Sequence, residues 1–308
     1  MIRILAADGM EKGAVKALEE KGCEVVQQFY EVEDLKQAVK EFDALVVRSA
    51  TKVRVPVIDE AAAAGRLKII IRGGVGVDNI DVDYAKEKGI PVCNVPNYGG
   101  YSVSQFTIAL MLEACLHIGH HDRTVHEGKW QNSPDWCYWD YPLIELAGKT
   151  FGLLGCGRIG IHTAEAAKGL GMHVIAYNRS QSQAAKDLGV EFVDLDGLFA
   201  RSDVLALQMP LADFNVGIIN KENIAKMKDG VIFVNTSRGN NVDEEALLEG
   251  LNSGKIRGAG LDVYAEEPAK NEALLNHPNV SCTPHIGAAT KEAQKRIGME
   301  IVSIIDNL

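Results

Sequence analysis

Several features that mark particular classes of protein are missing from this sequence. It has no Cys-x-x-Cys pair, no Cys/His spacing typical of a metal site, and no internal repeat or low-complexity tract. No apolar run approaches the ~20 residues of a membrane span, and the apolar start of the chain is too short for a signal peptide. We therefore expect no metal, no membrane association, a cytoplasmic location, and cysteines that are reduced and packed. The cysteines are Cys23, Cys93, Cys115, Cys137, Cys156 and Cys282.

Basic residues are also in deficit. The chain has 32 Lys and Arg against 42 Asp and Glu, a formal net charge of -10, and the acidic residues are spread along it. This balance favours solubility and disfavours binding to phosphate backbones, so nucleic acid is not an expected partner. At 308 residues and 46% hydrophobic, the chain is long enough for two domains, each with its own core.

Short apolar runs alternate with amphipathic stretches of helical period in the first hundred residues. They predict strands over residues 2–6, 24–26, 44–47, 68–71 and 91–93, and helices near 10–21, 31–40, 55–64 and 81–88. Strands that alternate with helices are typical of a parallel sheet covered by helices.

A second series of the same kind follows a connecting segment. The connector, about residues 102–127, is rich in Leu, Ala, Ile and Met and predicts one long helix. Strands are predicted over residues 150–154, 173–177, 190–193, 204–207, 231–235, 258–262 and 280–283. The last segment, 288–307, has helical period and no strand of its own, so we expect it to pack onto the first unit. The predicted fold class is α/β, with two doubly wound parallel-sheet domains.

A glycine motif stands directly after the first strand of the second series. The run Thr150–Leu154 is followed by Gly155, Gly157 and Gly160 in G-x-G-x-x-G spacing, and then by a helical pattern. Such glycines allow a tight turn, close approach of a pyrophosphate and close helix–strand packing, with the helix N-terminus facing the anion. The spacing and context indicate a dinucleotide site, and the alternative is a tight turn that binds nothing.

The end of the next strand usually selects between NAD and NADP. An acidic side chain there binds the ribose 2′-hydroxyl of NAD. Here the strand ends in Asn178, Arg179 and Ser180, so no carboxylate repels a 2′-phosphate, and Arg179 and Ser180 are able to bind one. The alternative is a neutral turn that accepts either cofactor. NAD and NADP both remain open.

Three chemically active residues follow predicted strands of the second series: Arg238, Glu267 and His285. Arginine binds a carboxylate in a bidentate manner and polarises the neighbouring carbonyl, while histidine delivers the proton that accompanies hydride transfer. A glutamate close to the histidine favours its protonated form. Singly each residue is more often structural, in a salt bridge or a turn, but together they indicate chemistry on a 2-oxo acid.

Over essentially its whole length the chain resembles the D-2-hydroxyacid dehydrogenases. The resemblance rests on Gly155–Gly160, Asn235–Gly239, Gly260–Pro268 and Thr283–His285, in that order. It implies Arg238 as the ligand of the substrate carboxylate and carbonyl, Glu267 paired with His285, and His285 as acid/base. It also implies a flavodoxin-like substrate domain (1–98 and 287–308), a Rossmann cofactor domain (99–286) and a homodimer. The implied cofactor-binding residues are Gly155, Gly157, Arg158, Ile159, Gly160, Asn178, Arg179, Ser180, Pro210, Thr236, Ser237, Asp262 beside the nicotinamide, Gly287 and Ala288.

Two positions depart from that family's pattern. Asn178 replaces the acidic residue that is common there, which puts NAD specificity in doubt. Gln208 and Met209 stand where the family often has His and Thr before the proline.

Two arginines in the first domain bear on the choice of substrate. Arg48, next to Ser49, and Arg72 lie at the carboxyl ends of predicted buried strands, where the ligand crevice opens. Two further guanidinium groups suggest a phosphate on the substrate, and these segments look like those of D-3-phosphoglycerate dehydrogenases. Backbone amides of Gly73, Gly74 and Val75 form a potential anion nest for the substrate carboxylate. The alternative is that both arginines pair with acidic neighbours.

Other segments look more like glycerate dehydrogenases, also called hydroxypyruvate reductases. These are residues 94–105 and 128–140, and Tyr98-Gly-Gly100 replaces the Gly-Asn-Ser that phosphoglycerate enzymes often carry. On balance the sequence favours D-3-phosphoglycerate, with D-glycerate and hydroxypyruvate as the alternative. A rival of another class is an NADH-sensing corepressor, which relatives of this family include; the absence of a disordered extension for docking partners argues against it.

An aromatic cluster lies between the connector and the cofactor strand. Its members are Trp130, Trp136, Tyr138, Trp139 and Tyr141. Aromatic residues favour interfaces, so we expect this loop to cross to a partner subunit; the alternative is that it covers its own core.

Overall fold

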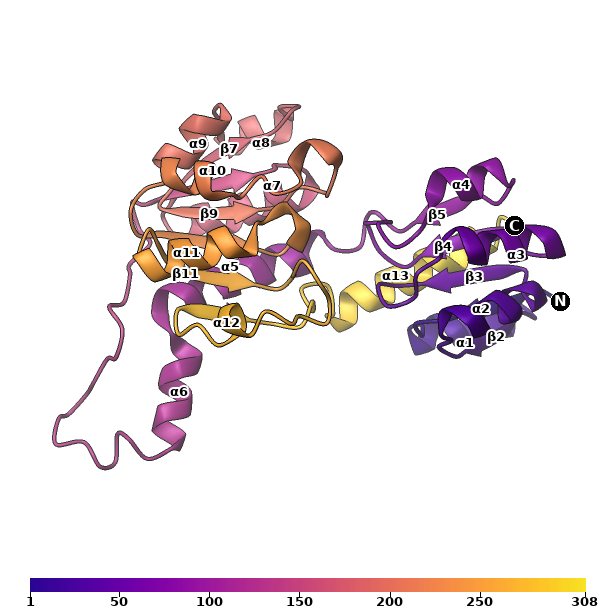
Figure 1. Ribbon diagram of the computed structural model, residues 1–308, viewed down its shortest axis with the longest axis horizontal. Helices are drawn as coiled ribbons and strands as arrows, with labels where there is room; N and C mark the ends of the chain where they lie inside the picture. Colours follow the sequence, from indigo (N-terminus) through magenta and orange to yellow (C-terminus); the bar gives the residue numbers. More distant parts are fainter. The chain divides into compact units, whose positions relative to one another are not determined.

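The computed structural model describes all 308 residues and divides into two α/β units (Figure 1). Unit 1 consists of Met1–Gly99 and Ala288–Leu308, and unit 2 of Gly100–Gly287. Each boundary lies one residue from the predicted one.

Unit 1 is built on a parallel five-stranded sheet of order β2-β1-β3-β4-β5, the flavodoxin-like order. Its strands are β1 (Arg3–Ala6), β2 (Glu24–Gln27), β3 (Ala44–Val47), β4 (Ile69–Arg72) and β5 (Val92–Asn94). Its helices are α1 (Lys12–Glu20), α2 (Val32–Ala38), the 3-10 turn η1 (Val39–Glu41), α3 (Val55–Ala64), α4 (Val82–Glu87) and α13 (Lys291–Ile305). The central strands β3 and β4 are buried along their whole length, because helices cover both faces.

The C-terminal helix α13 completes unit 1, as predicted. Its apolar face, including Ile297, Ile301 and Ile305, is buried in the same cluster as Ile4 of β1 and Leu18 of α1. A Cβ atom on Gly298 would lie 2.6 Å from the Cβ of Ala14, so this glycine permits the close packing of α13 on α1.

Unit 2 is built on a parallel seven-stranded sheet of order β12-β11-β10-β9-β6-β7-β8. Its strands are β6 (Thr150–Leu154), β7 (His173–Tyr177), β8 (Glu191–Phe192), β9 (Val204–Leu207), β10 (Val231–Asn235), β11 (Ile256–Leu261) and β12 (Val280–Cys282). Its helices are α5 (Gly100–Leu116), α6 (Ile118–His126), α7 (Arg158–Gly169), α8 (Gln183–Asp187), α9 (Leu195–Arg201), η2 (Asp213–Asn215), α10 (Lys221–Lys226), η3 (Gly239–Asn241), α11 (Glu244–Ser253) and α12 (Glu272–Leu275). The order runs outward in both directions from β6, as in Rossmann domains, so the predicted fold class is confirmed.

The predicted long connector helix is wrong in one respect, because it breaks at His117. This residue has φ 48° and ψ 42°, and α5 and α6 meet at 64°. The carboxylate of Glu113 accepts the N–H of Gly119 beyond the break, and the ring of Tyr141 stacks on His117 at 4.2 Å. Tyr141 belongs to a loop more than twenty residues further along the chain, so helical periodicity does not reveal its contact with His117. Beyond the break, α6 and the segment after it extend from the body of unit 2 (Figure 1).

No single helix is long and apolar enough to cross a membrane. The bent pair α5 and α6, taken together, has the length and apolar composition of a span. The apolar composition of α5 has another explanation within unit 2. Leu110, Met111 and Ala114 are buried in a core cluster with Phe151 of β6.

The cysteines differ in exposure, and Cys23 and Cys93 are partly buried. Cys115 and Cys156 are buried, and burial raises the pKa of each thiol to about 11. Cys137 and Cys282 are exposed, so the expectation that the thiols are packed is wrong for these two. All six are free.

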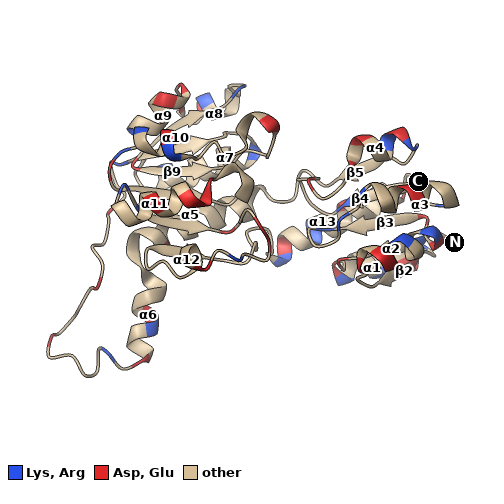
Figure 2. Ribbon diagram, viewed as in Figure 1, with Lys and Arg blue, Asp and Glu red and all other residues tan.

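Acidic and basic residues are interspersed on the helices of both units (Figure 2). Many form surface ion pairs, such as Lys40 with Glu60 at 2.7 Å and Arg201 with Glu191 at 2.6 Å. Exposed pairs of this kind contribute little to stability, so the fold rests on its buried apolar clusters.

Candidate active site

The predicted site residues of unit 2 gather at one edge of its sheet. The glycine loop follows β6, and Asn178 follows β7. Arg238 and His285 come shortly after β10 and β12. Because all seven strands are parallel, their carboxyl ends share this edge, which is where open α/β sheets bind ligands.

The turn between β6 and α7 requires glycine at two positions. Gly155 has φ +101°, and a Cβ atom there would lie 2.6 Å from the backbone oxygen of Gln208. A Cβ atom on Gly160 would lie 2.9 Å from the backbone oxygen of Gly155. Side chains at either position would force β6, β9 and α7 apart.

The middle glycine leaves room for a ligand. Nothing lies within 4 Å of a Cβ atom placed on Gly157, which is exposed and is the N-cap of α7 without a side-chain cap. The amides of Arg158 and Ile159 begin a twelve-residue helix whose dipole favours an anion at this end. These residues therefore fit the pyrophosphate of a dinucleotide.

In the turn after β7, the side chain of Asn178 contacts the glycine loop, whereas Arg179 is exposed to solvent. The Asn178 side chain accepts the N–H of Cys156 at 3.3 Å and donates to the backbone oxygen of Ser180. Arg179 is exposed, and its guanidinium lies 4.7 Å above the ring of Phe214. Asn178 thus ties this turn to the glycine loop, and Arg179 is the group available to a ribose phosphate.

The loop that carries Arg238 is fixed by its neighbours. The buried Asn235 accepts the N–H of Ser237 at 3.0 Å and donates to the backbone oxygen of Arg238 at 2.9 Å. The Ser237 hydroxyl donates to the backbone oxygen of Met209, just before Pro210. Gly239 admits no side chain, because its Cβ would lie 1.8 Å from the carbonyl carbon of Tyr264.

Glu267 and His285 form the predicted pair. His285 Nδ1 lies 2.7 Å from Glu267 Oε2, and each side chain is 34% exposed. The other carboxylate oxygen accepts the N–H of Tyr264 at 3.2 Å. Burial raises the pKa of Glu267, but the hydrogen bond and charge of His285, the N–H of Tyr264 and the charge of Arg238 outweigh it, so that pKa lies below its ordinary value. The three predicted catalytic residues are therefore close enough to act on one another.

Asp262 holds the turn that bears His285. It is 2% exposed, and it accepts the Thr283 hydroxyl at 2.7 Å and the N–H groups of Ile286 and Gly287 at 2.8 Å each. His285 itself has φ +54°, a conformation unusual for a residue with a side chain. Three hydrogen bonds to one carboxylate hold the turn in place around it.

In unit 1, Arg48 and Arg72 occupy different environments. Arg72 is 8% exposed, donates to the Ser49 hydroxyl at 3.1 Å, and lies so close over Gly74 that a Cβ atom there would be 1.2 Å from its Nη1. Arg48 is half-buried and forms no ion pair with an acidic neighbour. Arg48 is therefore the more available cation.

The proposed anion nest is smaller than the sequence suggested. The N–H of Gly73 donates to Val47 and that of Gly74 to the backbone oxygen of Arg72, at 2.8 and 2.7 Å. Both amides are therefore occupied by backbone partners. The next two residues are Val75, which is exposed, and Gly76. Their amides are the ones that remain to bind a carboxylate. Ala288, the last predicted cofactor ligand, begins the C-terminal segment of unit 1.

The sequence analysis missed two residues that hold the segment of unit 1 around Arg48. Asp8, after β1, accepts the N–H of Arg48 at 2.6 Å and the hydroxyl of Thr51 at 2.6 Å. Asn79 donates to the backbone oxygens of the same two residues. The position of Asp8 just after a buried strand was the available signal, and nothing in the sequence marked Asn79.

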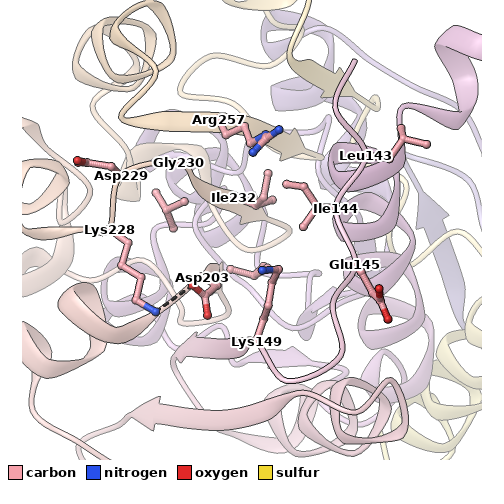
Figure 3. Close-up of a pocket in the computed structure, with 12 residues that line it drawn as sticks. Leu143, Ile144, Glu145, Lys149, Asp203, Lys228, Asp229, Gly230, Ile232 and Arg257 are labelled. Carbon is pink, nitrogen blue, oxygen red and sulfur yellow. Dashed lines mark hydrogen bonds and ion pairs between the residues drawn. The ribbon is translucent and has the colours of Figure 1, made fainter. Parts of the chain in front are cut away.

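A cavity of about 420 Å³ lies at the opposite edge of unit 2 (Figure 3). Its lining includes Lys149, Asp203 and Lys228, which precede β6, β9 and β10, respectively. Lys228 donates to Asp203 at 2.9 Å. Because these residues mark the amino ends of the strands, the cavity is separate from the edge that carries the glycine loop and His285.

Comparison with known proteins accords with this geometry. Residues 108–287, which include the whole carboxyl edge of unit 2, match the family model for "D-isomer specific 2-hydroxyacid dehydrogenase, NAD binding domain". The chain belongs to this family. The D-2-hydroxyacid dehydrogenases are oxidoreductases that act on CH–OH donors with a nicotinamide dinucleotide, so the predicted reaction class is confirmed.

Relatives in this family carry two different substrate names. The chain is 46% identical to a hydroxypyruvate reductase of Thermotoga maritima over 98% of its own length and 97% of that protein. It is 43% identical to a D-3-phosphoglycerate dehydrogenase of Archaeoglobus fulgidus, covering 100% of this chain but 57% of that one. An NADPH-dependent glyoxylate/hydroxypyruvate reductase of Sinorhizobium meliloti, solved with NADP and malonate, superimposes with a TM-score of 0.87 at 28% identity, over 99% and 92% of the two chains.

Proposed function

We propose that this D-2-hydroxyacid dehydrogenase reduces hydroxypyruvate to D-glycerate. We base the choice of substrate on the environment of Arg72. Its guanidinium is turned onto Gly74 and Ser49, which makes it part of the loop and a poor ligand for a distal phosphate. The full-length similarity to a hydroxypyruvate reductase supports the same choice.

The residues of unit 2 supply the acid/base chemistry. When bound, the reduced dinucleotide supplies the hydride that adds to the carbonyl carbon. Arg238 binds the carboxylate and polarises the carbonyl. Because Glu267 takes Nδ1 of His285, Nε2 is the nitrogen that delivers a proton to the carbonyl oxygen. The product is a 2-hydroxy acid, and oxidation follows the same path in reverse.

The second candidate substrate is 3-phosphohydroxypyruvate. One observation favours it: Arg48 is half-buried at the carboxyl end of β3, and its guanidinium forms no ion pair with a carboxylate. A single guanidinium that lacks a counter-charge is a plain candidate for a phosphate ligand.

We also propose that NADPH is the preferred donor. No carboxylate stands at position 178 to repel a 2′-phosphate, and Arg179 is exposed above Phe214 beside Ser180. A guanidinium at this turn forms charge-assisted hydrogen bonds with a phosphate but gains little from a hydroxyl.

We further propose a homodimer in which the segment after α6 contacts the partner. Trp136 and Trp139 on this segment are 87% and 67% exposed, which is unusual for large aromatic side chains. Light scattering measures the mass directly, and a monomer contradicts this proposal.

Oxidation of NADPH and NADH against four oxo acids tests the function. The acids are hydroxypyruvate, 3-phosphohydroxypyruvate, glyoxylate and pyruvate, ranked by kcat/KM. We expect hydroxypyruvate to rank first and Arg48→Ala to change its kcat/KM by less than about 3-fold. A preference for the phosphorylated acid, with KM raised about 10-fold or more by Arg48→Ala, establishes the second candidate instead. Turnover of none of these acids would favour the alternative of a dinucleotide sensor.

A further inference from the structure

Gln208, just after β9, lies under the glycine loop and reaches two helices. Its Nε2 donates to the hydroxyl of Thr107 on α5 at 3.0 Å and to the hydroxyl of Thr163 on α7 at 2.8 Å. Its backbone oxygen is the atom that excludes a side chain from Gly155. One residue therefore contacts the connector helix, the cofactor helix and the turn between β6 and α7.

The hydrogen atoms of this network can be assigned from the bonds around it. Thr163 donates its only hydroxyl hydrogen to the backbone oxygen of Ile159 at 3.0 Å, and Thr107 donates its own to Val103 at 2.8 Å. Both hydroxyls therefore accept from position 208, which requires the two hydrogens of an amide NH₂ group. The orientation of the Gln208 amide is fixed by this requirement.

The same assignment extends to the loop that carries Arg238. Thr236 lies two residues before Arg238, and its hydroxyl is 2.8 Å from that of Thr107. Because Thr107 has already given its hydrogen to Val103, Thr236 is the donor. Hydrogen bonds thus run from Thr236 to Thr107, and from Gln208 to both Thr107 and Thr163.

The carbonyl end of the Gln208 amide is also informative. Oε1 is buried without a hydrogen-bond partner and lies 3.5 Å from the position of a Cβ atom on Gly160. A neutral oxygen is tolerated there, but a carboxylate would place a negative charge beneath the turn that faces the pyrophosphate.

We propose that Gln208 is a positioning residue that fixes the glycine loop and the Arg238 loop relative to each other. The first loop holds the dinucleotide and the second holds the substrate carboxylate. Their relative position therefore aligns the hydride donor with the carbonyl carbon. This inference rests on the proposed roles of the glycine loop and Arg238. A histidine at this position has a single N–H when neutral, so it makes one of the two bonds.

Three variants at this position separate positioning from mere stability. We expect Gln208→Leu to lower kcat about 10- to 100-fold, because small misalignments of reacting groups have effects of this size. The primary isotope effect with NADPH deuterated at the transferred position rises, since hydride transfer becomes slower than the other steps. Gln208→His retains an intermediate kcat, and Gln208→Glu raises the NADPH dissociation constant, measured by calorimetry, by about 10-fold or more. Gln183→Leu, which removes a surface glutamine bonded to Asp187, is the matched control and leaves all three quantities unchanged.

Thr107→Val provides a second route if Gln208→Leu does not fold. It removes the bridge between Gln208 and Thr236 while it keeps the shape of the side chain, and it lowers kcat in the same way. In the double variant the two losses are less than additive, because both break one network. Unchanged kcat and isotope effect in folded Gln208→Leu or Thr107→Val overturn the inference, as does a loss that tracks melting temperature alone. If the wild-type protein turns over none of the acids, the proposed function is wrong, but the positioning role is still tested by NADPH binding. In that case, an unchanged NADPH dissociation constant in Gln208→Glu overturns the positioning role as well.

Discussion

The backbone and side-chain contacts of His285 suit the proton transfer that we propose for it. Its backbone has φ +54°, its turn is bound by Asp262, and its Nδ1 is taken by Glu267. Rotation of the imidazole is thereby restricted, and Nε2 is the ring nitrogen that Glu267 leaves unbound. The carboxylate is the partner that makes this possible, so its charge state controls the pair.

Glu267→Gln tests that control. Because the pKa of Glu267 lies below its ordinary value of 4.5, the carboxylate is charged at neutral pH, and its stabilising interaction is lost only as the pH falls through that lowered pKa. We expect the amide variant to lower the kcat of reduction by about 10- to 100-fold. Glu266→Gln, at an exposed neighbour that pairs with Lys270, is the control, and an unchanged kcat in Glu267→Gln contradicts the prediction.

Arg179→Ala tests the choice of dinucleotide at the same scale. A charge-assisted bond to the 2′-phosphate corresponds to about 1.5–3 kcal/mol, so the KM for NADPH is expected to rise about 10- to 100-fold. The KM for NADH stays the same, because NADH has no phosphate at that position. Arg201→Ala, which breaks a surface pair with Glu191, serves as control. Equal effects on both dinucleotides would show that Arg179 does not discriminate between them.

At the scale of elements, the turn between β6 and α7 separates packing from binding. Gly155 and Gly160 are required by nearby backbone atoms, whereas the space in front of Gly157 is open. Three glycines in one motif therefore have different physical reasons, although the sequence presents them alike.

Alanine at two of these glycines distinguishes the reasons. In Gly155→Ala, the new Cβ atom would lie 2.6 Å from the backbone oxygen of Gln208, and the residue would have to keep φ +101°. We therefore expect a loss of stability of about 3 kcal/mol or more, seen as a lower melting temperature. Gly157→Ala has no such contact and keeps its melting temperature, but it raises the dissociation constant of the dinucleotide. Normal dinucleotide affinity in Gly157→Ala would rule out the pyrophosphate at this turn.

At the scale of the whole molecule, the chain returns to its first unit after completing the second. Helix α13 supplies Ile297, Ile301 and Ile305 to the core of unit 1, although they follow unit 2 in the sequence. Each buried side chain of this kind contributes about 1.5–3 kcal/mol, and their total is comparable to the stability of a domain, about 5–15 kcal/mol.

A chain that ends at Gly287 is therefore expected to lose the structure of unit 1. Hydrogen exchange should show unprotected amides in β1, β3 and β4, while β6 and β10 of unit 2 stay protected and NADPH still binds. Removal of Asn307 and Leu308, which are exposed, is the control and leaves both units intact. Protected amides in β3 of the shortened chain would show that unit 1 folds without α13.

Much of the fold was predictable because its signals are local. Strands β3, β6, β7, β9 and β10 have the predicted bounds, since each is a short apolar run between polar turns. The long helix was predicted wrongly at His117, because the break depends on Tyr141 and on the Glu113 carboxylate. The assignment of Arg238, Glu267 and His285 to the reaction stays a prediction, although the structure places the pair Glu267 and His285 at 2.7 Å.

The α/β class, the glycine loop and the order of the motifs can be inferred from the amino-acid sequence alone, because hydrophobic period and glycine spacing act over a few residues. Which distant side chains meet is a property of the tertiary structure. It joins Arg72 of β4 to Ser49 after β3, leaves the guanidinium of Arg48 available, and joins Gln208 to two helices. Such contacts depend on how strands and helices far apart in the chain pack together, and no local pattern encodes that arrangement.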